Sequence, residues 1–258
     1  MTNGAGRSNS SHETLMTHLS RRLWSAFTAP SYPRWLLGVV LLWTGAWSIN
    51  PLHPADFAIE HILTVLLLAL LIATRKRFPL SHLSYSCIAV FLLLHAVGAH
   101  YTYSEVPYER WFACATGISV DRLFGFERNQ FDRLVHFAFG LLFAYPAREV
   151  FLRVAQVKGF WGYFLPLDVM MSFSMLYELL EWGVAMVMSD GVSQSYLGTQ
   201  GDVWDAQKDM ALAAFGALLA MATTALINVR LQRDFAQEFN HSLTAHRGPL
   251  GENSLTKR

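Results

Sequence analysis

The stretch GTQGDVWDAQKDM, residues 198–210, runs directly into the apolar segment 211–227. Within this stretch, Asp202, Asp205 and Asp209 are spaced i, i+3 and i+7, so on a helix their carboxylates form one stripe. Together with the residues just before it, the apolar segment is long enough to cross a bilayer as a helix. A stripe of acids at the mouth of a membrane helix is costly, and such residues usually have a function. The stretch therefore predicts a membrane helix that begins in a polar site.

Apolar residues dominate the rest of the chain and come in long blocks. Of the 258 residues, 53% are hydrophobic and 15% are charged, whereas about 25% of the residues of a soluble domain are charged. This composition predicts an all-α fold, a polytopic membrane helix bundle. A net charge of +1 gives no indication of nucleic-acid binding. The polar start of the chain lacks the early apolar core of a cleaved signal peptide, so none is expected.

The apolar blocks predict six membrane helices. The first is short for a hydrocarbon core of roughly 30 Å, so we expect it to extend or tilt. A polar, partly disordered N-terminal tail (1–34) and a C-terminal tail (231–258) flank this membrane domain (35–230). Cys87 lies inside an apolar block and Cys114 in a loop on the other side of the membrane, so no disulfide is predicted. The six predicted spans are 35–49, 57–73, 83–99, 132–147, 164–188 and 207–227.

Basic residues give the orientation of the helices. Lysine and arginine are concentrated before the first span, in the second and fourth connections, and after the sixth span, whereas the first and fifth connections contain neither. By the positive-inside rule both termini are expected in the cytoplasm. The third connection, 100–131, then lies outside although it carries charges of both signs. Its aromatic residues predict a folded loop over the helix ends.

With this orientation, four helices bring unusual polar residues into the outer half of the membrane. Asp132 and His136 are i, i+4 and share a helix face, and Glu178 and Glu181 are i, i+3 and share another. An unpaired charge at the centre of a membrane helix costs about 2.5–3.5 kcal/mol even on the mildest scale, so exposure of these groups to lipid is not expected. The sequence therefore predicts a polar cavity that opens toward the outer face.

Three kinds of chemistry fit such a cavity: acid–base catalysis, binding of an anionic headgroup, and binding of a divalent metal. Membrane lipid is the expected partner, and the sequence names no protein partner. We expect the catalytic groups to be His136, Glu178 and Glu181. The expected substrate-binding groups are Arg128, Arg133, His100 and Tyr101, and the expected metal ligands are Asp202, Asp205 and Asp209.

Simpler structural roles are open for several of these residues. The arginines, Asp132 and the glutamates could form ion pairs that hold helices together. Asp202 could cap the start of the last helix, and Lys208 could pair with a neighbouring acid. A histidine inside a membrane helix, such as His95, more often makes an interhelical hydrogen bond than a ligand contact. Glu60 and Asp168 lie near other helix ends and are set aside.

Four segments together resemble the bacterial inner membrane protein family YjdF: AHYTY (99–103), ERNQFDRLVHF (127–137), LYELLEW (176–182) and the opening stretch. The resemblance runs in order through most of the chain, and the opening stretch is its most specific part. Phe131 stands where the family has tyrosine. This likeness implies a multipass inner membrane protein and names no reaction.

A fainter likeness over the last three spans is to VanZ-like membrane proteins, which are associated with tolerance of glycopeptide antibiotics. Such proteins similarly combine a histidine-bearing helix, an acidic helix and an aspartate-rich helix start. This likeness favours a role in envelope lipid or cell-wall precursor biology.

Three functions follow as hypotheses. The first is an enzyme that acts on a lipid or isoprenoid-phosphate headgroup. The second is a transporter or lipid-binding protein, and the third is a structural or assembly protein. No nucleotide-binding glycine loop, HExxH zinc motif or CxxC redox motif is present. Whether the protein is an enzyme is left open by the sequence.

Overall fold

The computed structural model describes residues 29–187, 199–231 and 235–243. The predicted tails therefore lie largely outside the described residues, as does the last residue of the predicted fifth span. Throughout the described part, the regular structure is helical, which confirms the predicted all-α fold. Five helices are long and apolar enough to cross a membrane, namely α3 (Pro54–Thr74), α4 (His82–His100), α7 (Phe131–Val154), α8 (Trp161–Val187) and α10 (Asp205–Leu231).

The first predicted span is the helix α2 (Tyr32–Trp47), which has 16 residues. At 1.5 Å per residue it is about 24 Å long, shorter than a typical hydrocarbon core. It lies alongside α4, where the Trp43 indole N–H donates to the Leu93 carbonyl at 3.0 Å. Many of its apolar side chains are exposed, such as Leu42 at 78%, as expected of a surface that contacts lipid. It is thus the shortest of the six helices that correspond to predicted spans.

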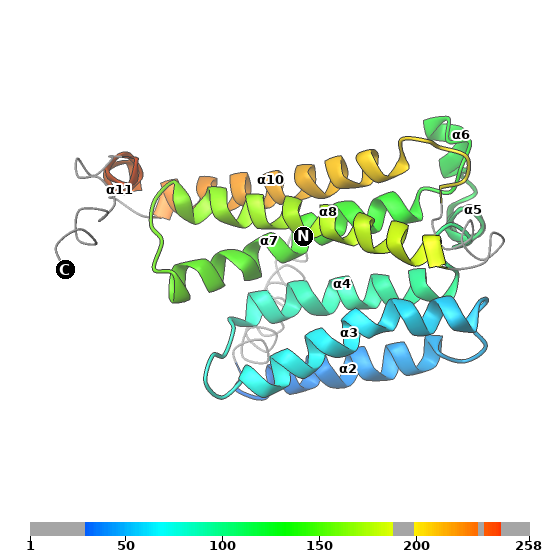
Figure 1. The fold of residues 1–258 in the computed structure, drawn as a ribbon, viewed down its shortest axis with the longest axis horizontal. Helices are drawn as coiled ribbons and strands as arrows, with labels where there is room; N and C mark the ends of the chain where they lie inside the picture. Colours follow the sequence, from blue (N-terminus) through cyan, green and yellow to red (C-terminus); the bar gives the residue numbers. More distant parts are fainter. Residues whose placement is uncertain (1–28, 188–198, 232–234, 244–258) are drawn as a thin grey trace, which may run out of the picture.

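The helices form two groups, α2–α3–α4 and α7–α8–α10, with their long axes roughly aligned (Figure 1). The groups meet where α4 packs on α7. Phe91 of α4 contacts Phe139 and Phe143 of α7 through edge-on ring packing. Within the second group, α7 and α10 share the most extensive contact, and α8 packs on both. This arrangement places the first turns of α7 and α10 side by side.

The predicted fourth span ended at residue 147, but α7 continues to Val154. It passes through Pro146 and then carries Arg148 and Arg153. The Arg153 guanidinium donates to Glu149 at 2.8 Å, and that of Arg148 lies over the Tyr163 ring at 4.7 Å from its centroid. Because both guanidinium groups have a partner within the protein, α7 can extend beyond the apolar stretch of the sequence.

Short helices cover the two ends of the bundle. In the third connection, α5 (Tyr108–Thr116) and α6 (Val120–Phe124) lie at the end where α10 begins (Figure 1). At the opposite end, α11 (Phe235–Ser242) packs on the start of α8. The basic connections lie at the α11 end, so the predicted orientation would put α5 and α6 outside the cell. That sidedness stays a prediction.

Glycine makes the α7–α10 contact possible. A Cβ on Gly140 of α7 would overlap the backbone carbonyl of Ala213, and a Cβ on Gly216 of α10 would overlap that of Phe137. Ala213 and Ala217 of α10 are fully buried on the same face. Small residues at a helix–helix contact let the backbones approach closely, which is a main source of attraction between helices in lipid.

The first prediction tests this contact. Gly140→Ala and Gly216→Ala force the two helices apart, and overpacking of this kind costs about 1–3 kcal/mol. We expect a lower free energy of unfolding in mixtures of a mild detergent and SDS. Gly45→Ala in α2 is the matched control, because nothing lies within 4 Å of its new Cβ. A loss in the control as large as in the two variants would contradict a role of the α7–α10 contact.

Candidate functional site

The polar residues predicted to converge do meet at the start of α7 and α10, but in two separate clusters. We call the first the ion-pair cluster; it consists of Arg128, Arg133, Asp202, Asp205 and Lys208. The Arg128 guanidinium forms a fork on Asp205, with Nη1 on Oδ1 and Nη2 at 3.3 Å from Oδ2. The Asp205 side chain is only 5% exposed, so this is a buried, bidentate ion pair.

Asp202 lies at the other side of the ion-pair cluster. Its Oδ2 accepts from Arg133 and from Lys208, each at 2.6 Å. Its Oδ1 accepts from the backbone N–H of Trp204 at 3.1 Å, just before α10 begins. The ion pair considered for Lys208 is therefore present, whereas Asp202 bonds a turn before α10 instead of capping the helix directly before Asp205.

These contacts lower the pKa of Asp202 to about 2, chiefly through the Lys208 hydrogen bond and then the Trp204 N–H. A depressed carboxyl pKa contributes stability above the unfolded-state value of about 3.9. That contribution is lost only as the pH falls through about 2. The Asp202 carboxylate is therefore ionised at neutral pH and available to both of its cationic partners.

Asn129 and Gln200 fasten the loop before α7 to the loop before α10. The Asn129 N–H donates to the Gln200 side-chain oxygen at 2.9 Å, and the Gln200 amide donates back to the Asn129 carbonyl at 3.2 Å. The Asn129 side chain also accepts from the N–H of Phe131 at 3.0 Å, at the start of α7. The starts of α7 and α10 are thus held together by these hydrogen bonds as well as by the ion pairs.

The second group, which we call the acid–histidine cluster, consists of Asp132, His136, Glu178 and Asp209. His136 Nε2 lies 3.6 Å from Asp132 Oδ1, and His136 Nδ1 lies 3.7 Å from Glu178 Oε1. One ligand atom from each of Asp132, His136 and Asp209 lies within 4.8 Å of the other two. Two helices, α7 and α10, therefore contribute one compact set of metal-binding groups, and α8 adds Glu178 beside it.

The acid–histidine cluster is buried and incompletely bonded. Asp209 is 2% exposed and its Oδ1 has no hydrogen-bond partner; the Glu178 side chain is 10% exposed and its Oε1 likewise has none. Each such buried, unpaired carboxylate oxygen costs free energy. Among the ion pairs of the described residues, no lysine or arginine reaches the acid–histidine cluster. The two clusters thus differ in their charge compensation.

A third set of polar side chains lies near the acid–histidine cluster. Glu60 of α3, 8% exposed, accepts from Tyr177 of α8 at 3.0 Å and from Tyr103 at 3.4 Å. The Tyr103 hydroxyl also lies 2.5 Å from His95 Nδ1 of α4. Burial raises the pKa of the Tyr103 phenol well above its usual range, so it keeps its proton as a donor. His95 thus contacts the turn that follows its own helix, whereas the prediction was a hydrogen bond to another helix.

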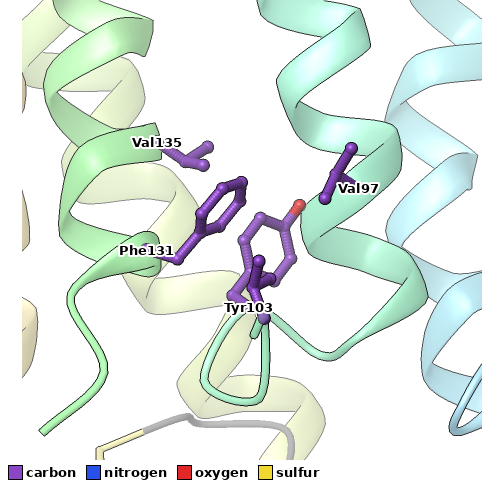
Figure 2. Close-up of a cluster of buried hydrophobic side chains, with 5 residues drawn as sticks. Val97, Tyr103, Phe131 and Val135 are labelled. Atoms are coloured by element: carbon purple, nitrogen blue, oxygen red, sulfur yellow. The ribbon is translucent and has the colours of Figure 1, made fainter. Parts of the chain in front are cut away.

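Tyr103 reaches this position because the chain folds back at the end of α4. Figure 2 shows its ring between Val97 of α4 and the side chains of Phe131 and Val135 of α7. Thr102 and Tyr103 both have positive φ, which costs about 1–3 kcal/mol each for residues other than glycine. A Cβ on Gly98 would overlap the Tyr103 ring, so this packing requires glycine there. The strain is offset by apolar packing and by the hydroxyl contacts.

A cavity of about 590 Å³ runs between α3, α4, α7 and α8. Its polar lining residues include Glu60, His95, Asp132, His136 and Tyr177. Toward the other end of the helices the lining is apolar, with residues such as Leu70, Leu71, Leu80, Pro146, Ala147 and Val150. The cavity therefore has one polar end and one long apolar end.

Two of the predicted site residues lie away from both clusters. His100 and Tyr101 pack against Trp47, with His100 Nδ1 at 2.7 Å from the Trp47 carbonyl oxygen, and neither lines the cavity. Glu181 lies beside Glu178 and Tyr177 on α8. Asp209 joins His136, whereas Asp202 and Asp205 bind the arginines. The structure thus divides the predicted metal set between the two clusters.

Two acids at the site were not among the predicted site residues. Asp132 was recognised only as sharing a helix face with His136, and Glu60 was set aside. A lone carboxylate in the mostly apolar run 57–73 was the available signal for Glu60. Its partners, Tyr103 and Tyr177, come from distant segments, and spacing within one helix cannot identify them.

The fold and the charged helix ends define a multipass membrane protein with a buried polar site. The chain belongs to the family of predicted membrane proteins DUF2238, which matches residues 32–230. It is 36% identical over 200 residues to the inner membrane protein YjdF of Escherichia coli (strain K12), an alignment that covers 77% of this chain and 90% of that protein. No solved structure matches the chain. The resemblance to YjdF and the inner-membrane localisation are thus confirmed.

The second prediction separates a structural role of the ion-pair cluster from a binding role. Arg128→Met leaves the Asp205 carboxylate buried without its fork, and removal of one partner of a buried pair costs about 3–5 kcal/mol. We expect the double variant Arg128→Met/Asp205→Leu to recover most of that loss in SDS unfolding. Lys208→Met is the control: its side chain is 50% exposed, so its loss should cost less than about 1 kcal/mol. An Arg128→Met protein as stable as the parent would exclude the structural role.

Proposed function

We propose that this inner membrane protein holds a membrane lipid in the cavity and acts on its phosphate-containing headgroup. The observation that supports this most directly is the shape and lining of the cavity, with His136, Asp132 and Glu60 at one end and apolar side chains at the other. A lipid has the same division, with a polar head and a long apolar tail. The argument has three parts: length, access and chemistry.

The apolar part of the cavity has the length of one leaflet. Glu60 and Leu71, which line its two ends on α3, are eleven residues apart, or about 16 Å along a helix. Half of a hydrocarbon core of roughly 30 Å is about 15 Å. With the predicted orientation, the polar end lies at the level of the outer leaflet headgroups, so the tail would extend toward the bilayer centre.

Lipid can reach the cavity from the side, between α3 and α8. Lining residues on both helices are also exposed on the surface, including Leu70 of α3 at 59% and Phe173 of α8 at 53%. Few residues of α3 are buried, namely Asp56, Glu60 and Thr64. The Tyr177–Glu60 hydrogen bond links the two helices near the polar end. A tail entering here would pass directly from hydrocarbon into the cavity.

The polar end offers acid–base chemistry. His136 can both accept and donate a proton, and Glu178 faces its Nδ1, which would orient the ring. In a hydrolysis, a water oxygen would bond to phosphorus as the bond to the leaving oxygen breaks. The water proton would go to His136, and the leaving alcohol would regain a proton from it. Arg128 and Arg133, predicted to bind the headgroup, are occupied by aspartates here, so a binding role would require those pairs to open.

The two other functions have weaker support. A transporter needs polar groups along its whole path, whereas the polar lining of this cavity lies toward one end. A purely structural role fits the ion-pair cluster but gives no reason for the unpaired oxygens of Glu178 and Asp209. Lipid binding without reaction shares the cavity with our proposal, and the experiments below separate the two.

The third prediction tests lipid occupancy. Thr64→Phe and Ser174→Phe each replace a buried, cavity-lining side chain with a larger one. We expect the bound lipid per chain, measured by native mass spectrometry from a mild detergent, to fall several-fold. Ile62→Phe and Met175→Phe are the matched controls on the same helices, because both sites are exposed and outside the cavity. Equal lipid retention by cavity and control variants would count against the proposal.

The fourth prediction tests the reaction. Protein in lipid nanodiscs is incubated with inner-membrane lipid extract, and headgroup products are followed by mass spectrometry. We expect His136→Gln to slow product formation by about 10²–10⁴-fold, the usual contribution of a general acid or base. The rate is compared per bound lipid, measured in the same variant, and the exposed His53→Gln should behave as the parent. A parent protein that binds lipid and changes no headgroup would be a lipid-binding protein instead.

A further inference from the structure

We propose that Asp132, His136 and Asp209 bind a divalent cation, with Glu178 orienting the histidine. Three independent observations support the site: the mutual distances of the ligand atoms, the unpaired buried oxygens, and the position of Glu178 relative to the ring. This inference does not rest on the proposed reaction: a cation on Nε2 occupies the lone pair that would accept a proton, so the metal-bound and proton-accepting forms of His136 are alternative states, which the metal titration below and the product assay above distinguish.

The distances fit one cation. Carboxylate oxygens and histidine nitrogens bind Zn²⁺ at about 2.0–2.2 Å, so two ligands of the same ion lie roughly 3–4 Å apart. His136 Nε2 and Asp132 Oδ1 are 3.6 Å apart, too far for a hydrogen bond and within that range. Ligand atoms of all three residues lie within 4.8 Å of one another, so only small side-chain movements would complete the set. The residues come from α7 and α10, whose close contact holds them rigidly.

The unpaired oxygens point to a ligand rather than to a structural network. Asp209 is 2% exposed, and its Oδ1 lacks a hydrogen-bond partner although polar groups surround it. The neighbouring Asp205, one turn earlier on α10, has both oxygens bound by Arg128. Two aspartates on the same helix thus have opposite surroundings. A cation would compensate the buried charge of the Asp209 carboxylate, as Arg128 does for Asp205.

Glu178 stands where metal sites usually carry a supporting carboxylate. A metal-bound histidine commonly donates its second N–H to a carboxylate, which fixes the ring and strengthens the ligand. Here Nε2 faces Asp132, and Nδ1 faces Glu178 Oε1 at 3.7 Å. Nε2 is therefore placed to bind a cation, and Nδ1 is placed to face the supporting carboxylate of Glu178. Glu178 is a positioning residue in this scheme, and it comes from a third helix, α8.

The ligand set favours a first-row transition metal. One imidazole with two carboxylates suits Zn²⁺ or Mn²⁺ better than Mg²⁺, which prefers oxygen ligands and retains water. Asp132 and His136 also line the cavity, so a bound ion would face its contents. A cation there would offset the repulsion between the clustered carboxylates and an anionic headgroup. The ion would then be shared between the protein and a phosphate oxygen.

The fifth prediction concerns metal binding by the full-length protein. The protein is purified in detergent through a tag without histidines, stripped with a chelator and titrated with Mn²⁺. Free Mn²⁺ is measured by its electron paramagnetic resonance signal. We expect one Mn²⁺ per chain, competition by Zn²⁺ and much weaker competition by Mg²⁺. Asp209→Asn and His136→Gln should each weaken binding at least tenfold, and Glu178→Gln by roughly 10–100-fold.

Asp205→Asn is the matched control, because it lies one turn from Asp209 and binds arginine instead. Its affinity for Mn²⁺ should stay within twofold of the parent; Asp202→Asn replaces it if that variant does not fold. A rise in the melting temperature of the parent with added Mn²⁺ or Zn²⁺ gives a second readout. The proposal is overturned if the stripped parent binds neither ion, or if Asp205→Asn loses binding as fully as Asp209→Asn. Either result would leave the lipid measurements above unaffected.

Discussion

The contact between α7 and α10 determines where the charged groups at the starts of these two helices lie. In a bilayer the hydrophobic effect does not drive helices together, so close backbone packing has to do so. Gly140 and Gly216 allow that packing, because any Cβ at either position would overlap the facing backbone. Both helices begin at the same end of the bundle (Figure 1). Their first turns therefore meet, which brings Arg128 to Asp205 and His136 to Asp209.

One helix end thus supports two clusters with opposite charge balance. In the ion-pair cluster, three cations surround two aspartates, and the fork of Arg128 on Asp205 leaves neither partner uncompensated. In the acid–histidine cluster, three carboxylates surround one histidine and two oxygens lack partners. Removal of charge from water is expensive unless it is paired, so the second arrangement is the less stable one. The first cluster links the starts of the same two helices, α7 and α10, that carry Asp132, His136 and Asp209 of the second.

The sequence was sufficient for the bundle, the approximate spans and the gathering of acids at one end, because hydrophobic length and helical periodicity carry that information. It was insufficient to predict which side chains pair with one another. Asp205 and Asp209 share one helical stripe, yet the first binds Arg128 and the second faces His136. Spacing gives the face of a helix, whereas the partner depends on the rotation and depth of the neighbouring helix. Glu60 was missed for the same reason, since its tyrosine partners lie 43 and 117 residues away.

The route into the cavity has a consequence for selectivity. A tail that moves sideways from the bilayer into an apolar cavity exchanges one hydrocarbon surface for another, so its burial contributes little binding free energy. Discrimination between lipids must then come from the polar end, where buried groups left without partners penalise a headgroup that cannot satisfy them. The unpaired oxygens of Glu178 and Asp209 are such groups. On this reasoning the acid–histidine cluster, rather than the much larger apolar lining, selects the molecule that the protein accepts.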